Sequence, residues 1–161
     1  MKKFFVAGIV VLCALMAAGV ETEAQLGVGA KVPPLIMPNF FVAYDLTDVQ
    51  MIELMGTIQS VQFASSITVG ATLKQFLNVL DIESVPLRPF LGGGATITLA
   101  TVNVVGQSSS SMAIALSALA GVEYAIGDTS LSASLEFIPS VVLSPIFGFH
   151  IGGAIGVRFD F

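Results

Sequence analysis

The chain has 161 residues and a net charge of −5, and only 11% of its residues are charged while 55% are hydrophobic. This acidic balance, without a basic cluster, argues against a nucleic-acid partner, because phosphates require Lys and Arg. So much apolar surface exceeds what one small soluble domain can enclose, and beyond the N-terminus no run approaches the roughly 20 apolar residues of a membrane-spanning helix.

The first residues have the pattern of a targeting segment. Two lysines precede an uncharged apolar run over residues 4–20, and small residues stand at the −3 and −1 positions before Gln25. The pattern predicts a Sec-type signal peptide, residues 1–24, with residues 25–161 as a single mature domain. An uncleaved helical anchor is the alternative. Cys13 is the only cysteine, so the mature chain would have neither a disulfide nor a thiol nucleophile.

Alternating apolar residues predict four strands in the first half of the mature chain. We expect them at Gln25–Val32, at Asn39–Leu46, within the irregular stretch Met51–Phe63, and at Ile67–Lys74. Prolines separate the first two, since proline cannot donate a hydrogen bond to the ladder. Residues 75–86 fit either a strand end or a short interfacial helix.

From Leu87 onward the alternation is stricter. Apolar or small residues alternate over 91–99, over 112–126 and over 130–137. The polar, serine-rich residues 103–111 are predicted to form a loop between the first two of these strands. A helix over 112–126 is the alternative, given its Ala and Leu content, but it would be too short to span a membrane.

A Gly-Asp dipeptide at 127–128 predicts a two-residue hairpin turn. The resulting register places Glu123 opposite Ser132 and Tyr124 opposite Leu131. Both polar faces then coincide, which is consistent with strands buried on one face.

The chain ends on the strand FGFHIGGAIGVRFDF, residues 147–161. Its odd positions are apolar or Gly, and its even positions are Gly, Ala and three ionisable residues. A large apolar face opposite a small or polar one is typical of a membrane-barrel strand. Pro139 and Pro145 bracket the preceding predicted loop, which contains the apolar residues 141–143.

These patterns together predict an all-β fold: a closed antiparallel transmembrane β-barrel that follows a signal peptide. Eight strands would have about 17 residues each with their connections, against the about 9–11 needed to span. No second domain fits.

The inward faces of this barrel carry most of the ionisable residues. They are Lys31, Lys74, Arg88, Glu123, Glu136, His150, Arg158 and Asp160. An eight-stranded barrel is just wide enough for side chains to fill it, so we expect these charges to be paired, with Glu123 bound to Arg158 or Arg88. Structural filling is the expected role, and a polar pathway or an acid–base pair is the alternative.

Nothing in the sequence predicts a catalytic, metal or cofactor site. His150 is the only histidine and no serine motif accompanies it, whereas a nucleophile needs a base within reach. One His without Cys cannot make a nitrogen or sulfur metal site. The Gly92–Gly94 run could suggest a phosphate loop, but within an alternating strand it is expected to relieve crowding.

Three stretches of the second half resemble the small eight-stranded outer-membrane barrels related to outer-membrane protein A, the opacity proteins and the OmpW type. They are RPFLGGGA at 88–95, GVEY at 121–124 with the following turn and LEF at 135–137, and the terminal strand. The resemblance implies both termini in the periplasm of a bacterium with two membranes, tight turns on that side, and residues 108–111 in an extracellular loop.

The last outward residues, Val157, Phe159 and Phe161, resemble the signal by which the barrel-assembly machinery recognises outer-membrane proteins. The chain departs from the family in having no Trp, short outer loops poor in charge, and no peptidoglycan-binding domain. Phe and Tyr would have to form the aromatic girdle, and adhesion and cell-wall tethering are put in doubt.

The leading functional hypothesis is therefore a non-enzymatic outer-membrane barrel that contributes to envelope integrity or surface structure. An OmpW-like conduit that releases small hydrophobic molecules sideways into lipid is the second, motivated by the proline-bracketed apolar segment. A lipid-acting enzyme using His150 is the third. Outer-membrane lipid is the expected partner, and the oligomeric state is left open.

Overall fold

The computed structural model describes residues 25–32, 39–82, 85–104 and 107–161, and the predicted signal peptide lies outside them. The described part of the chain contains nine strands, and none of its segments is a helix able to cross a membrane. The strands are β1 (Leu26–Val32), β2 (Asn39–Thr47), β3 (Gln50–Val61), β4 (Ala64–Phe76), β5 (Leu80–Ile82), β6 (Val85–Val104), β7 (Gln107–Ala125), β8 (Leu131–Ser144) and β9 (Gly148–Asp160).

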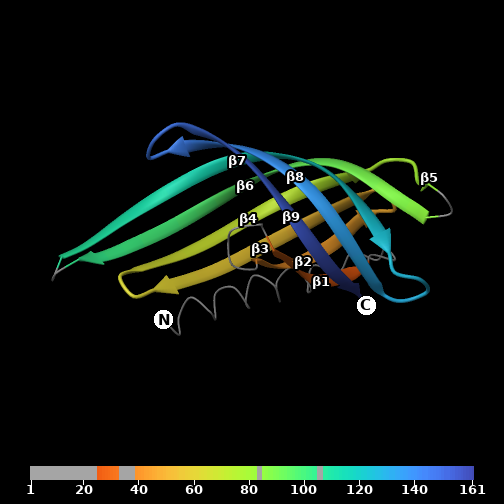
Figure 1. The fold of residues 1–161 in the computed structure, drawn as a ribbon, viewed down its shortest axis with the longest axis horizontal. Coiled ribbons are helices and arrows are strands. Elements are labelled where there is room, and N and C mark those ends of the chain that lie inside the picture. Colours follow the sequence, from red (N-terminus) through yellow and green to blue (C-terminus); the bar gives the residue numbers. More distant parts are fainter. Residues whose placement is uncertain (1–24, 33–38, 83–84, 105–106) are drawn as a thin grey trace.

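Eight of these strands close into a ring. The first and last strands, β1 and β9, pair antiparallel, and β4 pairs with β6, so the order around the ring is β1-β2-β3-β4-β6-β7-β8-β9 (Figure 1). Strand β5 pairs only with the start of β6. The predicted closed antiparallel barrel of eight strands is thus confirmed. We call the end where β1 begins and β9 finishes the terminal end, and the opposite end the far end.

Side chains alternate between the bore and the outer surface. On β9, Ala154 and Arg158 point inward and are buried, whereas Phe149 and Ile155 point outward with 66% and 63% of their surface exposed. Strand β3 alternates as well, with Met51 and Glu53 inside. Apolar residues occur on both of its faces, which is why its alternation is weak in the sequence.

None of the described residues between 75 and 86 is helical: β4 ends at Phe76, β5 covers Leu80–Ile82, and residues 85 and 86 already belong to β6. The Leu77 N–H donates to the Pro89 carbonyl at 2.8 Å, and pairing resumes at Leu80 with Leu87. Residues 78 and 79 therefore oppose Arg88 alone, which is a β-bulge. Strand β5 pairs with β6 beyond this bulge, on the same side of β6 as β4.

The polar loop predicted at 103–111 is wrong over most of its length. Strand β6 runs to Val104 and β7 begins at Gln107, with Asn103 opposite Ser108. In Figure 1 this hairpin reaches past the other strands at the far end. The backbone groups of this hairpin are paired between the two strands. Its serine side chains are exposed to the surroundings, so they do not need to be apolar.

The turn at 127–128 is longer than predicted. The Ile126 N–H donates to the Leu131 carbonyl at 2.8 Å, so these two residues form the last pair and residues 127–130 form a four-residue turn, with Gly127 at φ 57°. Glu123 consequently lies opposite Ser134 rather than Ser132, and Tyr124 opposite Ala133 rather than Leu131. The shift is two residues, so each side chain keeps its predicted face.

The prediction of a loop between Pro139 and Pro145 is also wrong. Strand β8 continues through Pro139 to Ser144, and only residues 145–147 connect it to β9. Pro139 lies opposite Ile151 of β9, but on the other side the β7–β8 pairing passes from Ser117 with Ser140 directly to Ala120 with Phe137. A proline lacks the N–H that the ladder needs, which explains this interruption.

Candidate functional site

Four charged side chains form a closed cycle inside the bore. Lys31 on β1 contacts both Glu53 on β3 and Glu136 on β8, the latter at 2.9 Å between Nζ and Oε1. Lys74 on β4 lies 2.7 Å from Glu53 and 2.7 Å from Glu136. Each lysine therefore binds both glutamates, and the four charges cancel. We call this group the ion cycle.

The ion cycle extends across the whole bore. In the ring, β3 and β8 are separated by three strands in either direction, so Glu53 and Glu136 stand on opposite walls. The two lysines bridge them from β1 and β4. Lys74 and Glu53 each have 1% of their surface exposed. Water therefore has almost no access to these two side chains.

A second charged group centres on Arg158 of β9. Its guanidinium lies 2.7 Å from Asp160 and 3.3 Å from Glu123 on β7. One of its N–H groups also contacts the sulfur of Met51. Arg158 is thus held by two carboxylates, whereas Glu123 has this single ion-pair partner among the described residues.

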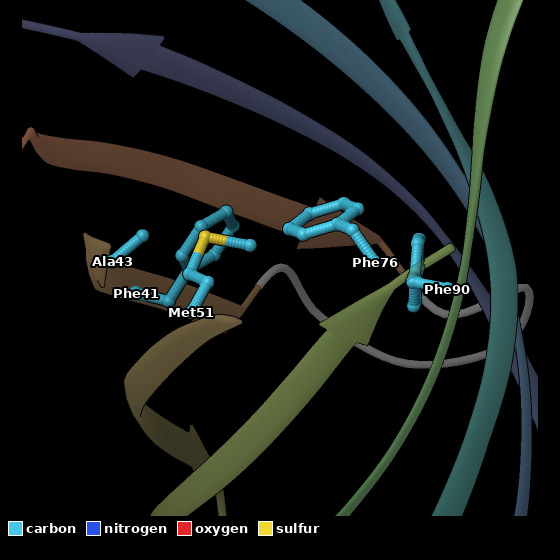
Figure 2. Close-up of a cluster of buried hydrophobic side chains, with 5 residues drawn as sticks. All are labelled: Phe41, Ala43, Met51, Phe76 and Phe90. Carbon is cyan, nitrogen blue, oxygen red and sulfur yellow. The ribbon is translucent and has the colours of Figure 1, made fainter. Parts of the chain in front are cut away.

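Aromatic and aliphatic side chains fill the bore next to the charges. Phe41, Ala43, Met51, Phe76 and Phe90 form one buried cluster (Figure 2). Met51 and Phe90 have 0% and 1% of their surface exposed. The rings of Phe76 and Phe90 meet edge to face at 5.7 Å between centroids.

The cluster and the ion cycle are in direct contact. The Lys74 ammonium lies 4.4 Å from the centroid of the Phe90 ring, and the Lys31 ammonium lies 4.9 Å from that of Phe41. Such cation–π contacts add to the ion pairs. A Cβ on Gly121 would come within 2.5 Å of the Phe90 ring, so this glycine leaves the room that the ring occupies.

Beyond the ion cycle, the far half of the bore contains paired hydroxyl side chains. Thr68 and Thr98 share a hydrogen bond of 2.8 Å, and Ser117 and Ser140 share one of 2.9 Å. Within the described ranges, no group of three or more His, Cys, Asp or Glu side chains is arranged to hold a metal ion.

The structure places the eight predicted inward residues in different situations. Lys31, Lys74 and Glu136 belong to the ion cycle, and Glu123, Arg158 and the half-buried Asp160 to the second group. The other two lie apart from both.

Arg88 and His150 are the two that lie apart. Arg88 is half-buried near the terminal end, where it donates to the Asp48 carbonyl at 3.0 Å and lies 4.3 Å from the Phe76 ring centroid. His150 is exposed near the far end, opposite Ser140. The register puts Arg88 opposite Glu123, but the ion pair that Glu123 forms among the described residues is with Arg158.

Glu53 is the member that sequence reasoning missed. It lies in the stretch whose alternation was weakest, since its inward neighbours Met51 and Met55 are apolar. The available signal was a single acidic residue within an otherwise apolar segment, which must be paired if it is buried.

The predicted insertion signal lies on the outer surface. Val157, Phe159 and Phe161 have 49%, 42% and 71% of their surface exposed, and the last two rings meet edge to face at 5.1 Å. The Phe161 N–H donates to the Leu26 carbonyl at 2.9 Å, so the last residue takes part in the closure of the ring.

Comparison with known proteins gives one clear result. No family model matches the chain, and no curated protein matches it. Among solved structures, the N-terminal β-barrel domain of Pseudomonas aeruginosa OprF is similar with a TM-score of 0.66 at 15% identity, over 86% of this chain and 96% of that one. This chain has the small outer-membrane β-barrel fold.

Neisserial surface protein A is similar as well, with a TM-score of 0.58 at 18% identity over 86% of this chain and 94% of that one. Identities this low show the fold alone. In small outer-membrane barrels the outward face meets lipid and the inward face forms the lumen. The ion cycle of this barrel therefore lies in its lumen.

Proposed function

We propose that this protein resides in the bacterial outer membrane as a closed, non-enzymatic barrel that contributes to envelope integrity. The ion cycle carries the proposal, because it joins opposite walls of the lumen through groups that are almost fully buried. Such a barrel presents lipid with a continuous apolar surface while admitting neither water nor ions.

The outward surface supports membrane residence. On β3, β4, β6 and β7, a row of aligned aliphatic side chains is followed toward the far end by a row of hydroxyl side chains. The aliphatic row is Ile58, Ile67, Leu99 and Met112, and the hydroxyl row is Ser60, Ser65, Thr101 and Ser110. At the terminal end the outward face carries Tyr44 and Tyr124, whose amphipathic rings suit a membrane–water interface.

The geometry around His150 supports the absence of enzymatic activity. The His150 side chain makes no hydrogen bond to any described residue, and the hydroxyl of Ser140, its neighbour across the sheet, is bound to Ser117 instead. A serine nucleophile needs a base within hydrogen-bond reach and a third group that orients the base. The part of the chain that the structure describes meets neither requirement at His150.

The composition of the far-end connections supports a passive role. Residues 33–38, 62–63, 105–106 and 145–147 include no charged residue. Recognition of a charged ligand at that end would require such groups. With both termini in the periplasm, as in our proposed orientation, this uncharged end faces the outside of the cell.

Planar-bilayer recording tests the closed lumen. We expect the wild-type conductance to equal that of protein-free bilayers, and stepwise openings would contradict the proposal. A variant with Lys31, Glu53, Lys74 and Glu136 all replaced by Ser is the matched comparison, because it removes the cycle and leaves the outer surface unchanged.

Loss of the gene in its host tests the envelope role. We expect faster entry of a hydrophobic dye and greater detergent sensitivity, restored equally by the wild type and by His150→Ala. Restoration by the wild type alone would favour an enzyme, and an unaltered envelope would contradict the integrity role.

Lateral passage of small hydrophobic molecules is the second candidate, and the interrupted β7–β8 ladder favours it. The seam at Pro139 lacks backbone pairs, and beside it the outward surface is hollowed between Ala120 and Val122 on β7 and Leu135 and Phe137 on β8. Uptake of a fluorescent hydrophobic probe by vesicles, equal with and without the protein, would remove this candidate.

A further inference from the structure

An apolar surface continues past the terminal end of the lipid-facing belt, on the hairpin of β5 and β6. Leu80 lies opposite Leu87 and Ile82 opposite Val85, so the four side chains share one face. Leu80, Ile82 and Val85 have 51%, 54% and 41% of their surface exposed. We call these four residues the hairpin patch.

The opposite face of this hairpin is not apolar. Asp81 pairs with Pro86 there, and the next inward residue on β6 is Arg88, which binds the Asp48 carbonyl. Apolar residues on one side and polar residues on the other make the hairpin amphipathic. Such an element is suited to lie at a boundary between water and an apolar medium.

The hairpin patch is continuous with the lipid-facing surface. Leu87 lies opposite Tyr124, Tyr124 opposite Ala133, and Ala133 opposite Val157, all on outward positions. Since tyrosine is enriched at the headgroup level, Tyr124 places the start of the patch at that level. Ile82 and Val85 then extend from it toward the periplasmic side.

The neighbouring strands have short apolar runs on their outward faces. On β3 the run covers Ile52–Ile58 and on β4 it covers Ile67–Leu73, each shorter than the about 9–11 residues that a spanning strand needs. Both are interrupted at Gln50 and Gln75, whose amides bind each other at 2.9 Å, and the exposed Leu77 follows Gln75. The hairpin follows β4 along the chain and supplies apolar surface where that run stops.

We propose that the hairpin patch inserts into the periplasmic leaflet of the outer membrane, at the boundary between headgroups and acyl chains. The occupant of this surface is phospholipid. Insertion removes the exposed apolar side chains from water, and it anchors the sector of the barrel whose own apolar belt is short. The proposal rests on the membrane residence and orientation proposed above, and it does not depend on whether the lumen is closed.

Tryptophan fluorescence tests this insertion, because the chain contains no Trp. Ile82→Trp, Leu91→Trp and Ser108→Trp would each be made in the full chain, extracted from membranes and reconstituted into phosphatidylcholine vesicles with bromine at shallow or deep acyl positions. Leu91 is an exposed lipid-facing residue and Ser108 lies on the projecting β6–β7 hairpin, so they bracket the expected range.

For Ile82→Trp we expect blue-shifted emission and at least about twofold stronger quenching by shallow bromine than Ser108→Trp shows. Leu91→Trp should respond more to deep bromine. Red emission quenched only by acrylamide would overturn the proposal, because the hairpin would then be in water. Shielding of this Trp from both acrylamide and the brominated lipids would overturn it too, since a protein rather than lipid would then cover the patch.

Discussion

Single charged residues in the lumen should have large effects on stability. Glu53→Gln removes a partner from both lysines of the ion cycle and leaves Glu136 as their only carboxylate. Because an uncompensated buried charge is strongly unfavourable, we expect a loss of about 3–5 kcal/mol in the free energy of unfolding. Urea titration in lipid vesicles measures it, and unchanged stability would contradict the role of the cycle.

Glu123→Gln provides the contrast at the same scale. Arg158 keeps Asp160 at 2.7 Å when Glu123 is neutralised, so its charge stays compensated. We expect a loss of about 1–2 kcal/mol, smaller than that of Glu53→Gln. The same titration compares the two, and an equal or larger loss for Glu123→Gln would show that the second group is as critical as the ion cycle.

Within strand β8, Pro139 should weaken the seam to β7. Pro139→Val restores an N–H, and the facing strand offers the carbonyl of Ala118 at this level of the ladder. We expect a gain of about 0.5–1.5 kcal/mol and slower amide exchange of the neighbouring residues.

Val141→Ile is the matched control for that seam, because it keeps an outward β-branched residue on the same strand and adds no donor. Faster exchange in Pro139→Val than in this control would mean that the proline itself stabilises the seam. If lateral passage occurs, Pro139→Val should also slow uptake of the hydrophobic probe.

The whole molecule should behave as a closed ring. Strands β1 and β9 pair from Gly27 with Asp160 to Val32 with Ile155, and every strand of the ring has two neighbours. We expect unboiled protein to migrate differently from boiled protein on a denaturing gel, because the ring resists detergent. Identical migration of the two samples would contradict closure.

The sequence by itself determined the class of fold and the face of nearly every strand. Period-two alternation needs no knowledge of neighbours, and the strict pattern of residues 147–161 and the small number of charges already require lipid on one side. Alternation also placed Lys31, Lys74 and Glu136 on inward faces, where they belong to the ion cycle, but it grouped the exposed His150 with them and missed Glu53.

Only the tertiary structure decided the register, the partners and the true ends of the strands. Serines at 108–111 and Pro139 signal loops locally, yet they stay in strands because pairing with their neighbours satisfies the rest of the backbone. Glu53 meets Lys31 and Lys74 through ring closure, which brings together residues distant in the chain. The residue pattern within one strand does not show which other strands it will face after closure, so the ion cycle could not be derived from such patterns.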